Sequence, residues 1–102
     1  MNALYAICWE ESERGWGTRP DGYTFHRSEL LALQYVVVFN SKMSKHIPDV
    51  YSRPVGDPRL IEVSQGLHDY VMKYGDVWLV PTYAAAYKNY DAAHLFASKE
   101  KT

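Results

Sequence analysis

The chain has 102 residues, the size of one domain, and 47% of them are apolar while 23% are charged. These proportions exclude a disordered or fibrous protein, and no apolar run in the sequence reaches the roughly 20 residues of a membrane-spanning helix. Eleven basic against twelve acidic residues leave no basic excess for tight, sequence-independent binding, so we expect neither nucleic acid nor membrane as a partner.

The N-terminal segment predicts a strand without a targeting sequence. No basic residues lead into an apolar stretch, and the single cysteine fits a reducing compartment, so we expect a cytoplasmic protein. Over residues 3–10, apolar side chains fall on both faces of the alternating pattern. One face carries Tyr5, Ile7 and Trp9, and the other carries Leu4, Ala6 and Cys8. A strand that is apolar on both faces is expected inside a sheet and not at its edge.

A loop and a short strand are predicted next. Pro20-Asp21-Gly22 is typical of a turn, because proline presets one backbone angle and glycine tolerates the positive φ that closes it. We expect a loop over residues 14–22, and a strand over residues 23–26 that returns antiparallel to the first.

The first predicted helix covers residues 28–44. Ser28 is a favourable N-cap, and Glu29 follows where the helix dipole favours an acidic residue. Residues 35–39, Tyr-Val-Val-Val-Phe, have the β-propensity of a buried strand, so that alternative stays open for them. The cap and the length of the segment before Pro48 favour the helix.

The remaining elements complete an α+β pattern. In chain order the sequence predicts a loop over 45–58, a strand at 60–63, a helix between Ser64 and Gly75, a strand at 77–80 and a helix over 83–98. The resulting order, ββαβαβα, predicts one domain over residues 1–102. We expect a small antiparallel or mixed sheet with helices packed mostly on one face.

No persuasive catalytic or metal-binding pattern occurs in the sequence. The histidines lie twenty or more residues apart, and no paired His or Cys has the spacing of a metal site: His26, His46, His68 and His94. Cys8 lies among apolar neighbours, as an inert core residue does. We therefore expect no enzyme, no metal and no cofactor.

One constellation has the residue types of a nucleotide site. It comprises Trp16, Arg19, Asp21, Tyr23, His26 and Arg53. Trp16 or Tyr23 could stack on a base, and the guanidinium groups of the two arginines could hold phosphates. Asp21 and His26 could supply polar contacts. A structural alternative stays open, in which Trp16 covers the edge of the sheet and Arg19 pairs with Asp21 or Glu13.

The predicted last helix carries a tyrosine stripe. Tyr83, Tyr87 and Tyr90 recur at the i, i+4, i+7 spacing of one helix face. Such a stripe packs on a sheet with its hydroxyl groups reaching water, or it forms a protein interface. The second alternative predicts a homo-oligomer that assembles through this helix.

Two motifs resemble a signature of small bacteriophage-encoded proteins of unassigned function. Residues 16–23 have the sequence Trp-Gly-Thr-Arg-Pro-Asp-Gly-Tyr and are followed by His26, and residues 48–54 have the sequence Pro-Asp-Val-Tyr-Ser-Arg-Pro. The resemblance covers most of residues 4–80. Small phage proteins of this architecture are often counter-defence factors, and in class the chain is similar to the anti-Thoeris sponges. Those proteins sequester a cyclic ADP-ribose signal without cleaving it.

The resemblance implies a phage protein that sequesters a nucleotide-derived immune signal in the host cytoplasm. Its partner would be that small molecule, bound without turnover. The alternative is a protein that inhibits a bacterial defence complex by direct contact, as anti-CRISPR proteins do. A third hypothesis, a small enzyme that degrades the nucleotide signal, is disfavoured by the missing catalytic residues.

Overall fold

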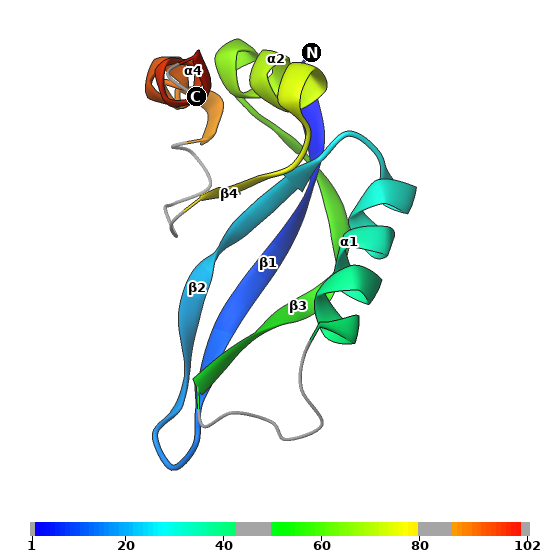
Figure 1. Cartoon of the computed structure of the whole chain (residues 1–102), viewed down its shortest axis with the longest axis vertical. Helices are drawn as coiled ribbons and strands as arrows, with labels where there is room; N and C mark the ends of the chain where they lie inside the picture. Colours follow the sequence, from blue (N-terminus) through cyan, green and yellow to red (C-terminus); the bar gives the residue numbers. More distant parts are fainter. Residues whose placement is uncertain (1, 43–49, 80–86, 101–102) are drawn as a thin grey trace.

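The molecule is built around one β-sheet, and its strands and helices follow one another along the chain in the order ββαβαβα (Figure 1). A computed structural model describes residues 2–42, 50–79 and 87–100. Four antiparallel strands lie in the order β3-β1-β2-β4. They are β1 (Ala3–Glu13), β2 (Gly17–His26), β3 (Val50–Glu62) and β4 (Val77–Leu79). The predicted α+β class is confirmed, and β1 lies inside the sheet as its two apolar faces require.

Serine caps begin two of the three described helices, α1 (Glu29–Ser41), α2 (Gln65–Tyr74) and α4 (Ala93–Glu100). The Leu31 amide donates to Ser28 Oγ at 3.1 Å, and the Leu67 amide donates to Ser64 Oγ at 3.2 Å. Gly75 ends α2 with a φ of 97°. Residues 35–39 lie inside α1, so the helix assignment is confirmed over the strand alternative.

The alternation along β1 builds two cores on opposite faces of the sheet. Leu4 and Ala6 pack with side chains of α2 and α4, while Ile7 and Trp9 pack with side chains of α1. Two of the three described helices therefore share one face, as the sequence predicts, and α1 covers the other. Figure 1 shows α2 and α4 together at one end of the sheet, apart from α1.

The predicted loop over residues 14–22 is mostly strand. The hairpin turns at residues 14–16, where Gly15 has a φ of 84° and the Trp16 amide donates to the Glu13 carbonyl at 3.0 Å. Asp21 is the extra residue of a bulge, because Trp9 pairs with Gly22 and Glu10 with Pro20. Proline is tolerated here because, among the described residues, β4 pairs with β2 only further along and leaves one edge of this stretch of β2 unpaired.

The predicted loop over residues 45–58 is also wrong from residue 50 onward, since β3 begins there; residues 45–49 lie outside the described residues. Because β3 lies at the edge of the sheet, it accommodates Pro54 and Pro58, which have no amide proton to donate to a neighbouring strand. Ala6 pairs with Arg59 and Cys8 with Val55, so three residues of β3 oppose one of β1. The bulge this makes contains Gly56, whose φ is 73°.

The last predicted helix, 83–98, is not continuous. Residues 83–86 lie outside the described residues, residues 89–92 are not helical, and α4 begins only at Ala93. The Ala93 amide donates to Asp91 Oδ1 at 3.0 Å, an arrangement that favours a new helix start. Tyr87 and Tyr90 therefore do not lie on one helix face. The strand predicted at 77–80 is observed over 77–79, and Val80 lies outside the described residues.

Candidate functional site

The two arginines predicted to clamp phosphates lie on opposite faces of the sheet. Arg53 Nε donates to Glu10 Oε1 at 2.5 Å, and an Arg19 guanidinium nitrogen donates to Glu11 Oε1 at 2.5 Å. Glu10 and Glu11 are neighbours on β1, so their side chains point to opposite faces. Each arginine is directly paired with its glutamate across the ladder. One phosphate group cannot contact both arginines in this arrangement.

The other residues of the predicted loop are also separated. Trp16 is at the hairpin tip with 84% of its surface exposed, so it does not cover the edge of the sheet. Asp21 accepts a hydrogen bond from the Ser52 hydroxyl, which ties the bulge of β2 to β3 across β1. Tyr23 and His26 are three positions apart on β2 and therefore face opposite sides. Arg19 pairs with Glu11, and not with Asp21 or Glu13.

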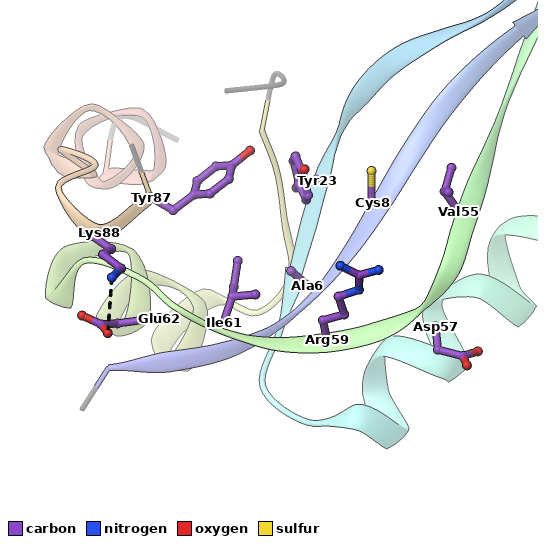
Figure 2. A pocket seen from close by; sticks show the side chains of 10 residues that line it. All are labelled: Ala6, Cys8, Tyr23, Val55, Asp57, Arg59, Ile61, Glu62, Tyr87 and Lys88. Carbon is purple, nitrogen blue, oxygen red and sulfur yellow. Dashed lines mark ion pairs between the residues drawn. The ribbon is translucent and has the colours of Figure 1, made fainter. Parts of the chain in front are cut away.

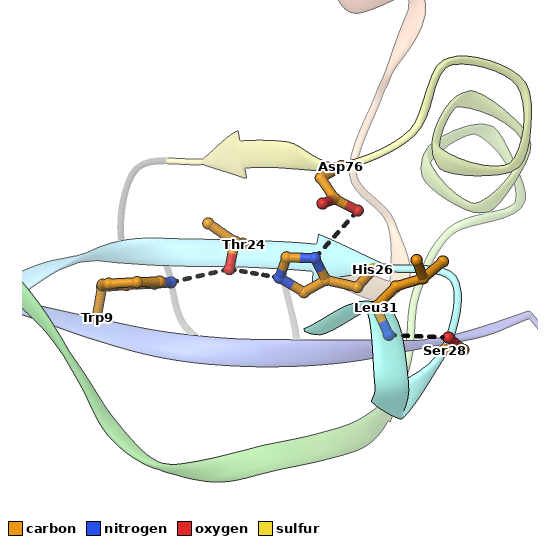
Figure 3. Close-up of polar contacts among 6 residues, drawn as sticks. All are labelled: Trp9, Thr24, His26, Ser28, Leu31 and Asp76. Carbon is orange, nitrogen blue, oxygen red and sulfur yellow. Dashed lines mark hydrogen bonds and ion pairs between the residues drawn. The ribbon is translucent and has the colours of Figure 1, made fainter. Parts of the chain in front are cut away.

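His26 belongs to a buried polar network beneath α1 (Figure 3). Trp9 Nε1 donates to Thr24 Oγ1 at 2.8 Å, and the same oxygen lies 2.7 Å from His26 Nε2. Because Thr24 Oγ1 accepts from Trp9, its own proton is directed to His26 Nε2. The proton of the neutral imidazole is then on Nδ1, which lies 3.0 Å from the Asp76 carboxylate.

This network is structural, although its order Asp-His-Thr resembles that of a hydrolase triad. Thr24 and His26 are fully buried, so no substrate reaches the threonine hydroxyl. Burial lowers the pKa of His26 below its ordinary value, and the nearby Asp76 carboxylate opposes that shift. The histidine therefore stays neutral near pH 7. Through its contact with Asp76, His26 connects β2 to the segment that leads into β4.

A cavity of about 500 Å³ opens on the other face of the sheet, where α2 and α4 leave the strands uncovered. We call it the open-face pocket. It is lined by Ala6, Cys8, Tyr23, Val55, Asp57, Arg59, Ile61, Glu62, Tyr87 and Lys88. Figure 2 shows the two short side chains of β1 on its floor, Tyr87 and Lys88 on one side, and the bulge of β3 on the other. The lining thus combines small side chains of β1 with residues of the β3 bulge.

Tyr87 places a buried hydroxyl beside this pocket. Only 1% of the residue is exposed, and its hydroxyl has no hydrogen-bond partner among the described residues. In Figure 2 the hydroxyl points toward Tyr23, whose ring lies edge-on at a centroid distance of 5.2 Å. Buried hydroxyl groups are ordinarily hydrogen-bonded, so this one keeps an unused donor and acceptor at the wall of the pocket that Tyr87 lines.

Two cations and a second tyrosine complete the polar lining. Within the described ranges no carboxylate lies at ion-pair distance from Arg59, and Lys88 Nζ lies 3.9 Å from Glu62. Burial raises the pKa of Tyr23, and the neighbouring Cys8 side chain raises it further. Tyr23 therefore stays a neutral phenol, able to donate a hydrogen bond. The pocket combines an apolar floor with donors at its rim.

Of the six predicted ligand residues, only Tyr23 lines the open-face pocket. The sequence did not indicate Arg59 or Lys88 as pocket residues, and it placed Tyr87 in an interface and not in a pocket. The strand pattern could have indicated Arg59, had residues 50–62 been assigned to one strand paired with β1. Of the predicted interface, Tyr87 is buried in the core and Tyr90 is half-buried, while Tyr83 lies outside the described residues.

Among the described residues, no group of three or more His, Cys, Asp or Glu side chains is placed to hold a metal ion. No described helix is long and apolar enough to cross a membrane. Comparisons with protein-family models, with curated proteins and with solved structures found no match for this chain.

Proposed function

We propose that this chain is a phage counter-defence protein that sequesters a nucleotide-derived immune signal in the open-face pocket without cleaving it. The phage context rests on the resemblance carried by residues 16–23 and 48–54. The binding rests on one observation above all, the buried hydroxyl of Tyr87 that lacks a partner among the described residues and lines a cavity also lined by Arg59.

The pocket has the size and the lining of a small-molecule site. Ligand cavities commonly measure about 300–1,000 Å³ and combine apolar walls with a few polar groups. Here Ala6, Val55 and Ile61 supply apolar surface, while the rings of Tyr23 and Tyr87 supply aromatic surface. A flat base gains contact area from both kinds of side chain.

The charged residues favour an anionic group on the ligand. Arg59 has no carboxylate partner among the described residues, so a phosphate displaces no existing ion pair when it binds there. Lys88 Nζ lies 3.9 Å from Glu62, so a bound phosphate that came closer to the ammonium group would replace only this long ion pair. Asp57 and Glu62 lie on the same lining and disfavour a densely charged polyphosphate. A nucleotide derivative with one or two phosphates fits this balance.

A thermal-shift screen tests the proposal, with mass spectrometry of the compound released by heat. The probes are AMP, ADP, ADP-ribose, cyclic ADP-ribose and cyclic dinucleotides. We expect at least one probe to raise the melting temperature, and to be released intact. Release of an altered compound would support the enzyme hypothesis instead, and no shift with any probe would contradict binding.

Matched arginine variants locate the site. Arg59→Gln should abolish the shift, whereas Arg19→Gln removes an exposed arginine on the opposite face and should leave it unchanged. If Arg19→Gln lost the thermal shift and Arg59→Gln kept it, the ligand would bind at the β1–β2 hairpin and not in the open-face pocket.

The exposure of Trp16 favours a second candidate function, inhibition of a defence protein through the hairpin tip. An indole with 84% of its surface exposed is a typical anchor of a protein interface. In that case Trp16→Ala should abolish capture of a host protein from lysate and leave every thermal shift by nucleotides intact.

A further inference from the structure

The outward face of α1 is mostly aliphatic, with Gln34 as the exposed polar residue among the apolar ones. Four aliphatic side chains on it are each between 44% and 67% exposed: Leu30, Leu33, Val37 and Val38. The only charged residue within α1 is Glu29 in its first turn, and its last turn carries no basic residue. Figure 1 shows α1 on the outside of the sheet, with no other described element beyond it.

The exposed residues follow one stripe along the helix. Positions 30, 33 and 37 are spaced as i, i+3 and i+7, and they lie opposite the side that packs on the sheet. That buried side consists of Ala32, Tyr35, Val36 and Phe39. A helix at a protein surface is ordinarily polar on its outer side, and one that is apolar all around is ordinarily covered on both sides.

We propose that a second copy of this chain covers the stripe, so that two α1 helices pack antiparallel about a twofold axis. The stripe offers no counter-charge to an acidic or a basic partner, whereas a second copy presents the same aliphatic side chains. Each copy has a formal net charge of −1, so two copies repel each other little. In the antiparallel pair Leu33 of one copy lies near Val37 of the other.

An exposed leucine of β3 extends the same surface. Leu60 pairs with Tyr5 across the ladder, and Tyr5 packs in the core beneath α1, so both side chains are on the α1 face. The 13 residues of α1 span about 20 Å, so a contact made through this one helix is small. We therefore expect a dimer that dissociates in the micromolar range.

The dimer leaves both open-face pockets accessible, because α1 and the pocket lie on opposite faces of the sheet. The predicted homo-oligomer is thus retained, but its interface is α1 and not the tyrosine segment. This inference is independent of the proposed function, since a failure to dimerise and a failure to bind nucleotides are measured separately.

Light scattering after size exclusion tests the proposal on the full chain, loaded from about 1 to 200 µM so that mass action populates both states. We expect the mass to rise from 11.8 kDa toward twice that value. Val37→Glu should remain at the monomer mass at every concentration. Glutamate favours helices more than valine does, so circular dichroism should show an unchanged fold.

Met72→Glu is the matched control, because it places the same charge at an exposed apolar site on α2. It should dimerise like the original chain. If Val37→Glu fails to fold, Leu30→Gln at the first turn of α1 serves instead. A constant monomer mass for the original chain would overturn the proposal. Dimerisation of a folded Val37→Glu or Leu30→Gln variant would also overturn it.

Discussion

Removing the Tyr87 hydroxyl should stabilise the fold and weaken ligand binding at the same time. Tyr87→Phe keeps the ring, which is 1% exposed and lies 5.2 Å from each of the rings of Tyr23 and Phe25. What the substitution removes is a buried hydroxyl that has no hydrogen-bond partner among the described residues.

The expected changes in stability and in affinity follow from comparing the free protein, where this hydroxyl has no partner among the described residues, with the complex. Burying a hydroxyl without a partner costs about 1–3 kcal/mol, so its removal should raise the unfolding free energy by about 1 kcal/mol. For a domain of this size that corresponds to a rise in Tm of about 4–8 °C. In the complex the hydroxyl gains a hydrogen bond, so its loss should weaken binding by about tenfold.

Urea denaturation and isothermal titration measure the two effects, with the probe that gives the largest thermal shift as ligand. Tyr70→Phe is the control, since Tyr70 belongs to the same core but does not line the pocket, and it should leave the affinity unchanged. A loss of stability in Tyr87→Phe would mean that the hydroxyl already has a partner. An unchanged affinity would mean that the ligand does not use it.

Three further predictions concern His26, Gly56 and Trp16. Because burial lowers the pKa of His26 below its ordinary 6.5, the unfolded chain takes up that proton first as the pH falls. Stability is therefore complete above pH 6.5 and decreases below it by up to about 1.4 kcal/mol per pH unit, and denaturation from pH 7.5 to 5 should show a smaller slope in His26→Gln. Gly56→Ala should cost about 1–2 kcal/mol, because φ at that position is 73° with open space around it, and an unchanged urea midpoint would contradict the bulge. Trp16→Ala should change the unfolding free energy by less than about 0.5 kcal/mol, as expected for a side chain that is 84% exposed, and a larger loss in a thermal melt would place the indole in a packed site.

The order of elements could be predicted from the sequence because local chemistry determines it. Ser28 and Ser64 cap helices through their own hydroxyl groups, and Gly75 ends one through a positive φ. The two apolar faces of β1 likewise required a central strand. Each of these features depends on residues within one element.

The proline-containing strands could not be predicted in the same way. Pro20 and Pro54 are typical of loops, and whether a strand tolerates them depends on which of its edges is paired. That pairing is a property of the sheet: β3 is an edge strand, and within the described part of the chain β4 pairs with three residues of β2. The predicted arginine clamp failed for the same reason, since strand register directs Arg19 and Arg53 to opposite faces.

The open-face pocket depends on contacts between distant segments. Cys8 and Arg59 come together only through the β1–β3 register, and Tyr87 reaches the sheet from a segment after β4. Nothing in the neighbouring sequence of Tyr87 distinguishes it from Tyr83 or Tyr90. The burial of its hydroxyl became visible only in the folded chain.

The most direct test of ligand binding in the open-face pocket is a titration of the ¹⁵N-labelled chain with ADP-ribose, followed by amide chemical shifts. We predict that the shifts concentrate at Cys8, Tyr23, Arg59 and Lys88, and that they vanish in Arg59→Gln. Shifts confined to the hairpin tip around Trp16, or no shifts at millimolar ligand, would contradict it.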